Sequence, residues 1–170
     1  MAELSLVLHV IAATLLVGPQ VLLFFAVVPA TWFVDDEQLR RDVTRTIVGR
    51  YGMIAGIAVV ILLVTGLYQF YSVTPDYITE DMSSYRFGWI FITKMTLFTM
   101  LIVLIGVHAV VGRRIGRLTD QVIAGEGDAA RLDDARRLSF MVSAGMMLVS
   151  IGVLVFGVLL GRSEYSWVLS

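Results

Sequence analysis

Three side chains that can carry a proton or bind a metal lie inside apolar segments of this chain. His9 lies in the first such segment, and Lys94 and His108 both lie in the third. A charged group at the centre of a membrane helix costs about 2.5 to 3.5 kcal/mol on insertion scales, so a titratable residue at that depth indicates a functional site. These three residues are therefore the first candidates for chemistry.

The composition places these residues in a membrane protein. The 170-residue chain is 58% hydrophobic and 16% charged, with a mean hydropathy of +0.84, whereas a soluble domain is about one-quarter charged. The net charge of -1 provides no basic field, so we expect no nucleic acid partner. The chain has no cysteine, which excludes disulfides, thiolate metal sites and cysteine nucleophiles.

Four apolar stretches, each long enough to cross a bilayer, are separated by three polar connections. The predicted fold class is all-α, an integral membrane four-helix bundle. We expect helices over about residues 4–34, 37–73, 87–122 and 129–161 of a single transmembrane domain that covers residues 1–170. Asp35 and Asp36 in the first connection suit a helix N-terminus.

The distribution of arginine predicts the orientation of the bundle. The first connection holds four arginines and the third holds six, whereas the middle connection offers only Arg86. Because short cytoplasmic loops are enriched in Lys and Arg, we expect loops 1 and 3 to be cytoplasmic and both termini to lie on the outer side. The expected location is the plasma membrane of a bacterium or an archaeon, as a multi-pass protein.

Residue counting assigns depths to the three candidates. His9 lies five residues after Leu4 and Lys94 lies five residues after Trp89, on two helices that both run inward. At 1.5 Å per residue these two side chains share an outer level, and His108, fourteen residues beyond Lys94, lies about 21 Å deeper. The two histidines are therefore not expected to bind one metal together in straight helices.

Helical periodicity of 100° per residue groups the polar side chains on faces. Lys94 shares a face with His108, His9 shares one with Gln20, and Arg50 lies on the polar face of the second helix. In lipid, such a face is expected to point to the bundle interior or to a cavity. A bundle with a polar interior follows from this pattern.

Small residues and prolines predict local features of the first two helices. Gly52 and Gly56 form a small-xxx-small pattern that favours close contact between membrane helices, and Gly49 precedes it. Pro19 and Pro29 predict a bend in the first helix. Such a bend either widens a cofactor cavity or has no further effect.

Short motifs spread in order along the chain resemble a known family. They are Leu8-His9-Val10-Ile11-Ala12, Thr65-Gly66-Leu67, Gly88-Trp89 followed by Lys94, and Gly106-Val107-His108 followed by Gly112-Arg113-Arg114. Together they resemble the membrane domain shared by CopD copper-resistance proteins and HemJ-type protoporphyrinogen oxidases. The HemJ resemblance implies haem b among the helices, with His9 and Lys94 as functional residues and Arg50 at a basic position. The CopD resemblance implies movement of copper across the membrane.

The chain departs from the HemJ pattern in two places. The residues from Thr14 to Gly18 include no tryptophan after the first-helix histidine. The residues from Met141 to Met146 contain neither the carboxylate nor the proline of the Asn-Glu-Val-Pro-like stretch of that branch. These departures favour a haem-binding relative over a strict oxidase.

A haem b site would use the outer pair. His9, as a neutral imidazole, could donate a ring nitrogen to iron, the commonest protein mode of haem ligation. Lys94 could serve as the opposite axial ligand in its neutral form, or it could stay charged and pair with a haem propionate. Gln20 and Thr65 could supply hydrogen bonds around the ligands.

The inner level has a secondary candidate and several structural alternatives. His108, with Arg50 near it in depth, could form a second metal or cofactor site or anchor propionates. Alternatively, His108 is a helix-end histidine bonded to a backbone carbonyl, and the arginines only set the topology. His9 and Lys94 could likewise extend to the outer interface without a cofactor.

Three functions remain open from the sequence. The first is a haem b-binding redox or electron-transfer protein, a candidate oxidoreductase, that passes electrons between a quinone or porphyrin-like substrate and a membrane partner. The second is a copper-transport protein in which His9, His108 and methionines line a path. The third is a non-catalytic accessory or assembly subunit of a membrane complex. All three functions are compatible with a homo-oligomer.

Overall fold

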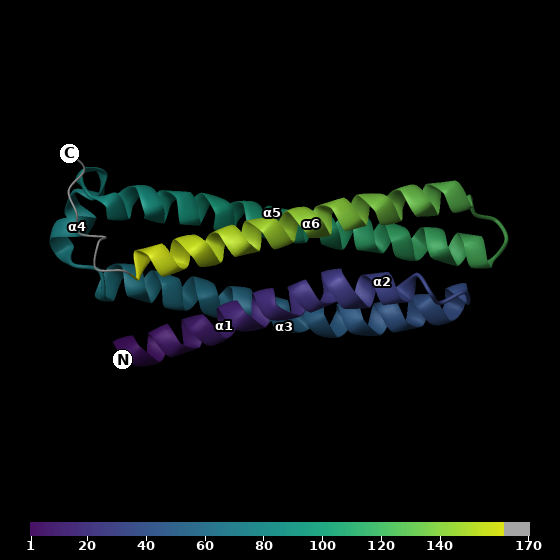
Figure 1. Cartoon of the computed structure of the whole chain (residues 1–170), viewed down its shortest axis with the longest axis horizontal. Helices are drawn as coiled ribbons and strands as arrows, with labels where there is room; N and C mark the ends of the chain where they lie inside the picture. The colour runs from purple at the N-terminus through teal and green to yellow at the C-terminus, as the bar shows by residue number, and fades with distance from the viewer. Residues whose placement is uncertain (162–170) are drawn as a thin grey trace.

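The computed structural model describes residues 1–161. Within that range the chain forms an all-helical bundle (Figure 1). Four of its helices are long and apolar enough to cross a membrane, which confirms the predicted fold class at that level. The first comprises α1 (Ala2–Leu22), the π-helical turn η1 (Leu23–Val27) and α2 (Val28–Thr31), and the others are α3 (Glu37–Ser72), α5 (Arg86–Ile123) and α6 (Ala129–Leu160). The middle connection contains the short helices α4 (Asp76–Glu80) and η2 (Met82–Ser84).

Aspartate side chains cap the N-termini of two long helices, α3 and α6. The sequence predicts such a helix start in the first connection. The Asp36 side chain accepts hydrogen bonds from the backbone N–H groups of Gln38 and Leu39 at the start of α3. Asp128 accepts one from Ala130 at the start of α6. Each carboxylate satisfies backbone donors that have no partner inside the helix and lies favourably at the positive end of its dipole.

The long helices form two antiparallel hairpins. α1 packs along α3, and α5 packs along α6. In Figure 1 the N-terminus, α4 and the end of α6 lie at one end of the molecule, and the turns before α3 and α6 lie at the other. We call these the α4 end and the arginine end, because the arginines of the first and third connections lie in the helices that meet there.

The first helix separates from α3 in the segment that contains Pro19 and Pro29. Val28 donates its backbone N–H to Leu23, five residues back, which is the π-helical register. Pro19 and Pro29 each lack a backbone N–H, so neither can continue a regular ladder of hydrogen bonds. Beyond this point the helix turns towards α6, where Phe24 stacks on Phe140 at a centroid distance of 4.8 Å.

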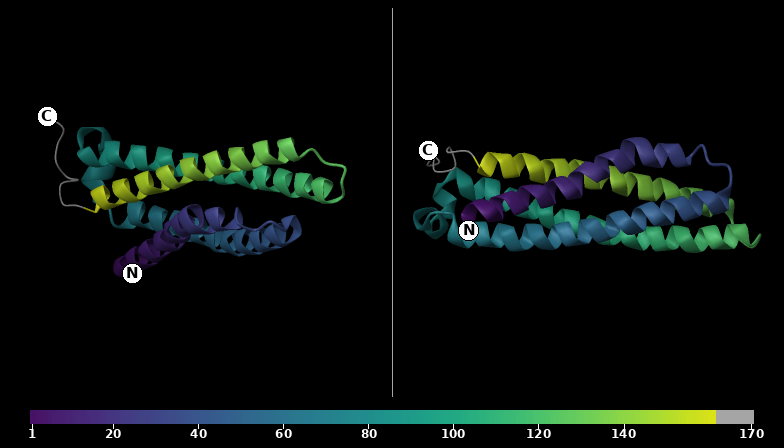
Figure 2. Two further views of the ribbon diagram at one scale, coloured as in Figure 1. Left: turned by 45° about the vertical axis from the view of Figure 1, so that its right-hand side comes forward. Right: turned by 90° about the horizontal axis from the view of Figure 1, so that it is seen from below.

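This change of partner is visible in the second view of Figure 2, where α2 stands apart from α3 at the arginine end. Trp32, directly after α2, also approaches the ring of Phe140. The first helix ends at Thr31. The backbone N–H groups of residues 32–34 each donate to the carbonyl three residues earlier, so this segment forms a turn. The helix is therefore shorter at this end than the expected range of 4–34.

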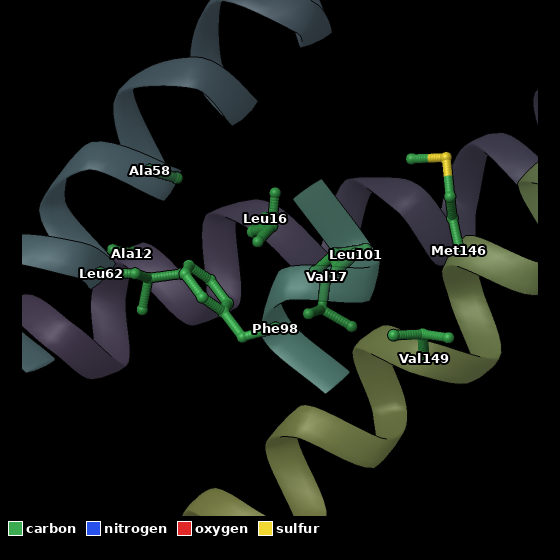
Figure 3. Packing of buried hydrophobic residues seen from close by; sticks show 9 residues of the cluster. All are labelled: Ala12, Leu16, Val17, Ala58, Leu62, Phe98, Leu101, Met146 and Val149. Carbon is green, nitrogen blue, oxygen red and sulfur yellow. The ribbon is translucent and has the colours of Figure 1, made fainter. Parts of the chain in front are cut away.

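One apolar core joins the two hairpins near the middle of the bundle. All four long helices contribute to it, as Figure 3 shows: Ala12, Leu16, Val17, Ala58, Leu62, Phe98, Leu101, Met146 and Val149. Large apolar side chains also cover the outside of the bundle, with exposed fractions such as 69% for Met53 and Val158. An apolar exterior around a small core is what a lipid environment requires.

The glycines of α3 do not make the close helix contact that their spacing predicts. A Cβ atom added to Gly49, Gly52 or Gly56 would have no neighbour within 4 Å. The reason is the departure of α2 from α3, which leaves this face of α3 without a partner. Instead, all three glycines border a cavity, which is described below.

Candidate functional site

His9 is held by a hydroxyl on the neighbouring helix. Its Nδ1 atom lies 2.7 Å from the Oγ1 atom of Thr65, which is buried on α3. Thr65 in turn donates its hydroxyl proton to the backbone carbonyl of Ile61 at 2.6 Å. Ser5, one turn before His9, reaches the Thr65 backbone carbonyl. The imidazole is thus attached to α3 through one defined chain of hydrogen bonds.

This chain of hydrogen bonds favours one tautomer of His9. The Thr65 hydroxyl has a single proton, and the backbone carbonyl of Ile61 at 2.6 Å is a well-placed acceptor for it. The hydroxyl oxygen is therefore an acceptor towards His9, so the proton between the two side chains belongs to Nδ1. The other ring nitrogen, Nε2, then carries a free lone pair. A hydrogen bond to one ring nitrogen that orients the other is typical of histidines that bind metals.

Lys94 belongs to the same layer of the bundle. Its ammonium group is close enough to His9 to interact with it electrostatically. A Cβ atom added to Gly157 on α6 would meet the Lys94 Nζ atom at 3.9 Å, so the lysine lies against the bare backbone of that glycine. We call His9, Thr65 and Lys94 the polar layer. It brings together the two residues that the sequence assigned to one level.

No carboxylate neutralises Lys94 within residues 1–161: none of the ion pairs there includes it. A buried ammonium without a counter-charge is costly, because desolvation is then not offset by a partner. The layer therefore combines a free imidazole nitrogen with an uncompensated positive charge. An anionic group that also accepts a nitrogen ligand would satisfy both.

His108 lies far from the polar layer. α5 is one continuous helix, so the fourteen residues between Lys94 and His108 correspond to about 21 Å. The nearest hydrogen-bonding partner of its Nδ1 atom is the hydroxyl of Ser143 on α6, at 3.5 Å. His108 thus bonds to a side chain and not to the backbone carbonyl considered above. The two histidines belong to separate sites.

His108 lines a large cavity between the hairpins. The cavity has a volume of about 2030 Å³ and reaches from the core residue Leu16 to the arginine end, with all four long helices in its wall. Ligand pockets in proteins are typically about 300–1,000 Å³, so this space is large enough for a substantial molecule. Neither His9 nor Lys94 borders it. The polar layer and the cavity are therefore independent features.

Three other side chains relate to this cavity in different ways. Gln20, only 7% exposed, lies at its border and accepts a hydrogen bond from Ser150 through its carbonyl oxygen, while its Nε2 atom has no partner. Tyr51 borders it and donates to the backbone carbonyl of Leu16 at 2.7 Å. Arg50 is exposed and does not border the cavity.

Sequence reasoning missed Tyr51 and Ser143 as polar residues of the interior. The only signal for Tyr51 was its position next to Arg50, one step of 100° around the helix. Ser143 lies in a stretch of small and apolar residues without any motif. Their interior positions depend on which helices lie side by side.

Ion pairs connect the hairpins at the mouth of the cavity. Glu37 at the start of α3 pairs with Arg40 on its own helix and with Arg136 on α6. Arg41 on α3 pairs with Asp120 on α5. These contacts join α3 to both helices of the second hairpin.

Within the described part of the chain, no group of three or more His, Asp or Glu side chains lies close enough together to hold a metal ion. Haem requires fewer protein ligands, because its porphyrin supplies four nitrogens. The polar layer fits haem in its donor set, since it offers one free imidazole nitrogen and a cation for a carboxylate.

Four membrane-length helices with an apolar exterior define a multi-pass membrane protein of the helical-bundle class. Comparisons with protein families, with curated proteins and with solved structures found no match. The functional assignment therefore depends on the residues and contacts described above.

Proposed function

We propose that this protein binds haem b in its polar layer and transfers electrons within the membrane, and that His9 would hold the iron through a ring nitrogen. The observation that carries the proposal is the hydrogen bond from His9 Nδ1–H to Thr65. It leaves Nε2 as a lone-pair donor, the form of imidazole that binds haem iron. The order of motifs shared with HemJ-type proteins agrees with this assignment.

Lys94 has the role of a counter-charge in this proposal. Its ammonium lies in the same layer as His9 and has no carboxylate partner within residues 1–161. A propionate of haem would neutralise it, and the pair would be strengthened by the low dielectric of the bundle interior. An arginine at this position should then preserve haem binding, because it retains the charge, whereas it cannot act as an iron ligand.

Bound haem would supply one-electron transfer, and the protein would supply orientation and exclusion of water. Thr65 orients the His9 ring, and the core residues Leu62 and Phe98 lie one helical turn from Thr65 and Lys94, respectively. Apolar surroundings of this kind influence the redox potential of a haem. The redox partner within this proposal is a quinone, a porphyrin or another membrane protein.

The orientation of the protein is a further part of the proposal. The arginine end is placed in the cytoplasm of a bacterium or archaeon and the α4 end outside, following the arginine content of the connections. The polar layer would then lie nearer to the outer face. Labelling of single cysteines introduced at Asp81 and at Glu126, which are both exposed, with a membrane-impermeant reagent would test it, because only the Asp81 position should react in intact cells.

An absorption spectrum of the purified protein tests haem binding directly. Protein from haem-replete cells should show a Soret band that is lost in His9→Ala and retained in His108→Ala. The Lys94→Arg variant should retain the band and Lys94→Gln should weaken it. A colourless wild-type preparation would refute the proposal, and loss of the band in His108→Ala but not in His9→Ala would move the haem to the inner level.

A further inference from the structure

The cavity at the arginine end has a charge pattern that the proposed haem site does not use. Among the described residues, seven arginines border it: Arg40, Arg41, Arg45, Arg113, Arg117, Arg136 and Arg137. Only three carboxylates do so: Glu37, Asp120 and Asp133. The three carboxylates form ion pairs with Arg40, Arg41 and Arg136. Four arginines at the cavity therefore have no acidic partner in residues 1–161.

The opposite part of the cavity is apolar. Its wall there includes Leu16, Ile102, Ile105 and Met146, which come from three different helices. Gly52 and Gly56 add bare backbone to the wall, with no neighbour within 4 Å of an added Cβ. The cavity thus has a cationic end and an apolar end, which is the complement of an anionic amphiphile.

The depths of the residues along α5 place the apolar end of the cavity within the hydrocarbon layer of a bilayer and its cationic end beyond that layer. About 20 helical residues cross the hydrocarbon layer, so a span that starts near Phe87 reaches its far boundary near His108. Arg113 lies five residues further, or about 7.5 Å beyond that boundary. On α6, Arg137 lies six residues before Ser143, the partner of His108, and so reaches a similar depth. Lipid phosphates lie in this zone.

We propose that the cavity binds one anionic phospholipid from the leaflet at the arginine end, between the two hairpins. Arg113 and Arg137 hold its phosphate, since guanidinium groups bind phosphate oxygens in a bidentate manner. Its acyl chains lie against Leu16, Ile105 and Met146. The volume of about 2030 Å³ exceeds what a free anion would occupy and suits two chains with a head group.

The tryptophans of this chain allow a direct measurement. The sequence has three, and of the two in the described residues, Trp32 borders the cavity and Trp89 does not. Full-length protein carrying Trp89→Phe and Trp167→Phe would report from Trp32 alone. Phosphatidylglycerol with brominated chains, added to the protein in detergent, should quench this fluorescence saturably. Phosphatidylcholine with the same chains should bind at least about tenfold more weakly, because it adds no net charge.

Matched variants separate the cavity from the general lipid surface. Ala109 borders the cavity and its neighbour Val110 does not, so Ala109→Phe should abolish saturable quenching and Val110→Phe should not. Arg113→Gln should weaken phosphatidylglycerol binding at least about tenfold, whereas Arg114→Gln, which lies outside the cavity, should not. Equal quenching by both lipids, or unchanged quenching in Ala109→Phe, would overturn the proposal.

Two further outcomes address other occupants of the cavity. Displacement of the lipid by inorganic phosphate alone would show a site for a free anion and would contradict a lipid site. Loss of the Soret band in Ala109→Phe would assign the cavity to haem, and would also contradict it. A retained Soret band with lost lipid binding in the same variant supports the lipid site independently of the haem proposal.

Discussion

The two halves of this bundle are packed in different ways, although the same four helices form both. In the half towards the α4 end, glycines let other groups approach closely: a Cβ at Gly88 would collide with the Met82 backbone, and one at Gly66 would meet the His9 ring at 3.6 Å. In the half towards the arginine end, a Cβ at Gly52 or Gly112 would meet nothing within 4 Å. We call the half with these close contacts the closed half, and the half that contains the cavity the open half.

The difference teaches where each kind of chemistry can occur. The closed half holds His9 in a single orientation through Thr65, which suits a ligand that must be positioned within tenths of an ångström. The open half is held together at its mouth by ion pairs such as Glu37 with Arg136. Ion pairs between partly exposed groups are weak and yield easily, which suits a site whose occupant enters and leaves.

The largest expected effect concerns the closed half. Gly88→Ala should lower the free energy of unfolding by about 2–3 kcal/mol, because the new methyl group would overlap the Met82 backbone and force α5 away from η2. The matched change in the open half, Gly112→Ala, should raise it by about 0.5–1 kcal/mol, because alanine favours the helix and meets no neighbour. Thermal unfolding in detergent measures both, and equal effects would contradict the contrast.

The second prediction concerns the hydrogen bonds of the two histidines. Thr65→Val preserves the shape of the side chain but leaves His9 Nδ1–H without a partner, so it should cost about 1–3 kcal/mol of stability. It should also weaken haem binding about ten- to a hundredfold if His9 is the ligand. Thermal unfolding and haem titration provide the two readouts.

The control for that prediction lies in the open half. Ser143→Ala removes the partner of His108, which is 3.5 Å away and so at the limit of a hydrogen bond. This variant should change stability by less than Thr65→Val and should leave the haem affinity unchanged. A larger effect of Ser143→Ala would reverse the roles of the two histidines.

The smallest expected effect concerns the mouth of the cavity. Glu37→Gln removes the acceptor shared by Arg40 and Arg136 and should cost about 1 kcal/mol or less, because both pairs are partly exposed. This loss of stability should be smaller at high salt, because salt already screens the ion pairs of the wild-type protein. Unfolding measured at low and high salt would check it, and a salt-independent loss would point to packing instead of charge.

Much of the fold could be predicted from the sequence because lipid imposes simple requirements. Long apolar stretches separated by polar turns predict helices, since every backbone group within a bilayer needs an internal hydrogen bond. The common level of His9 and Lys94 also followed from counting, because the rise of a helix is constant. The sequence also predicts Thr65 as a hydrogen-bonding residue beside a haem ligand, and Thr65 contacts His9.

Other features could not be read in this way. The spacing of Gly49, Gly52 and Gly56 predicted a close helix contact, but the first helix turns towards Phe140 and leaves that face of α3 open. Arg50 was expected in the interior and is exposed, while Tyr51 beside it borders the cavity. Facing depends on which helices are neighbours, and periodicity within one helix does not contain that information.

The sequence by itself determined the number, the length and the polar residues of the membrane helices, because hydropathy and helical rise are local properties. Only the tertiary structure decided that His9 meets Thr65, that Lys94 lies near His9, and that His108 lies instead at a cavity lined by arginines. These pairings depend on how two hairpins approach and diverge. That geometry follows from a π-helical turn between two prolines and from packing across the whole bundle.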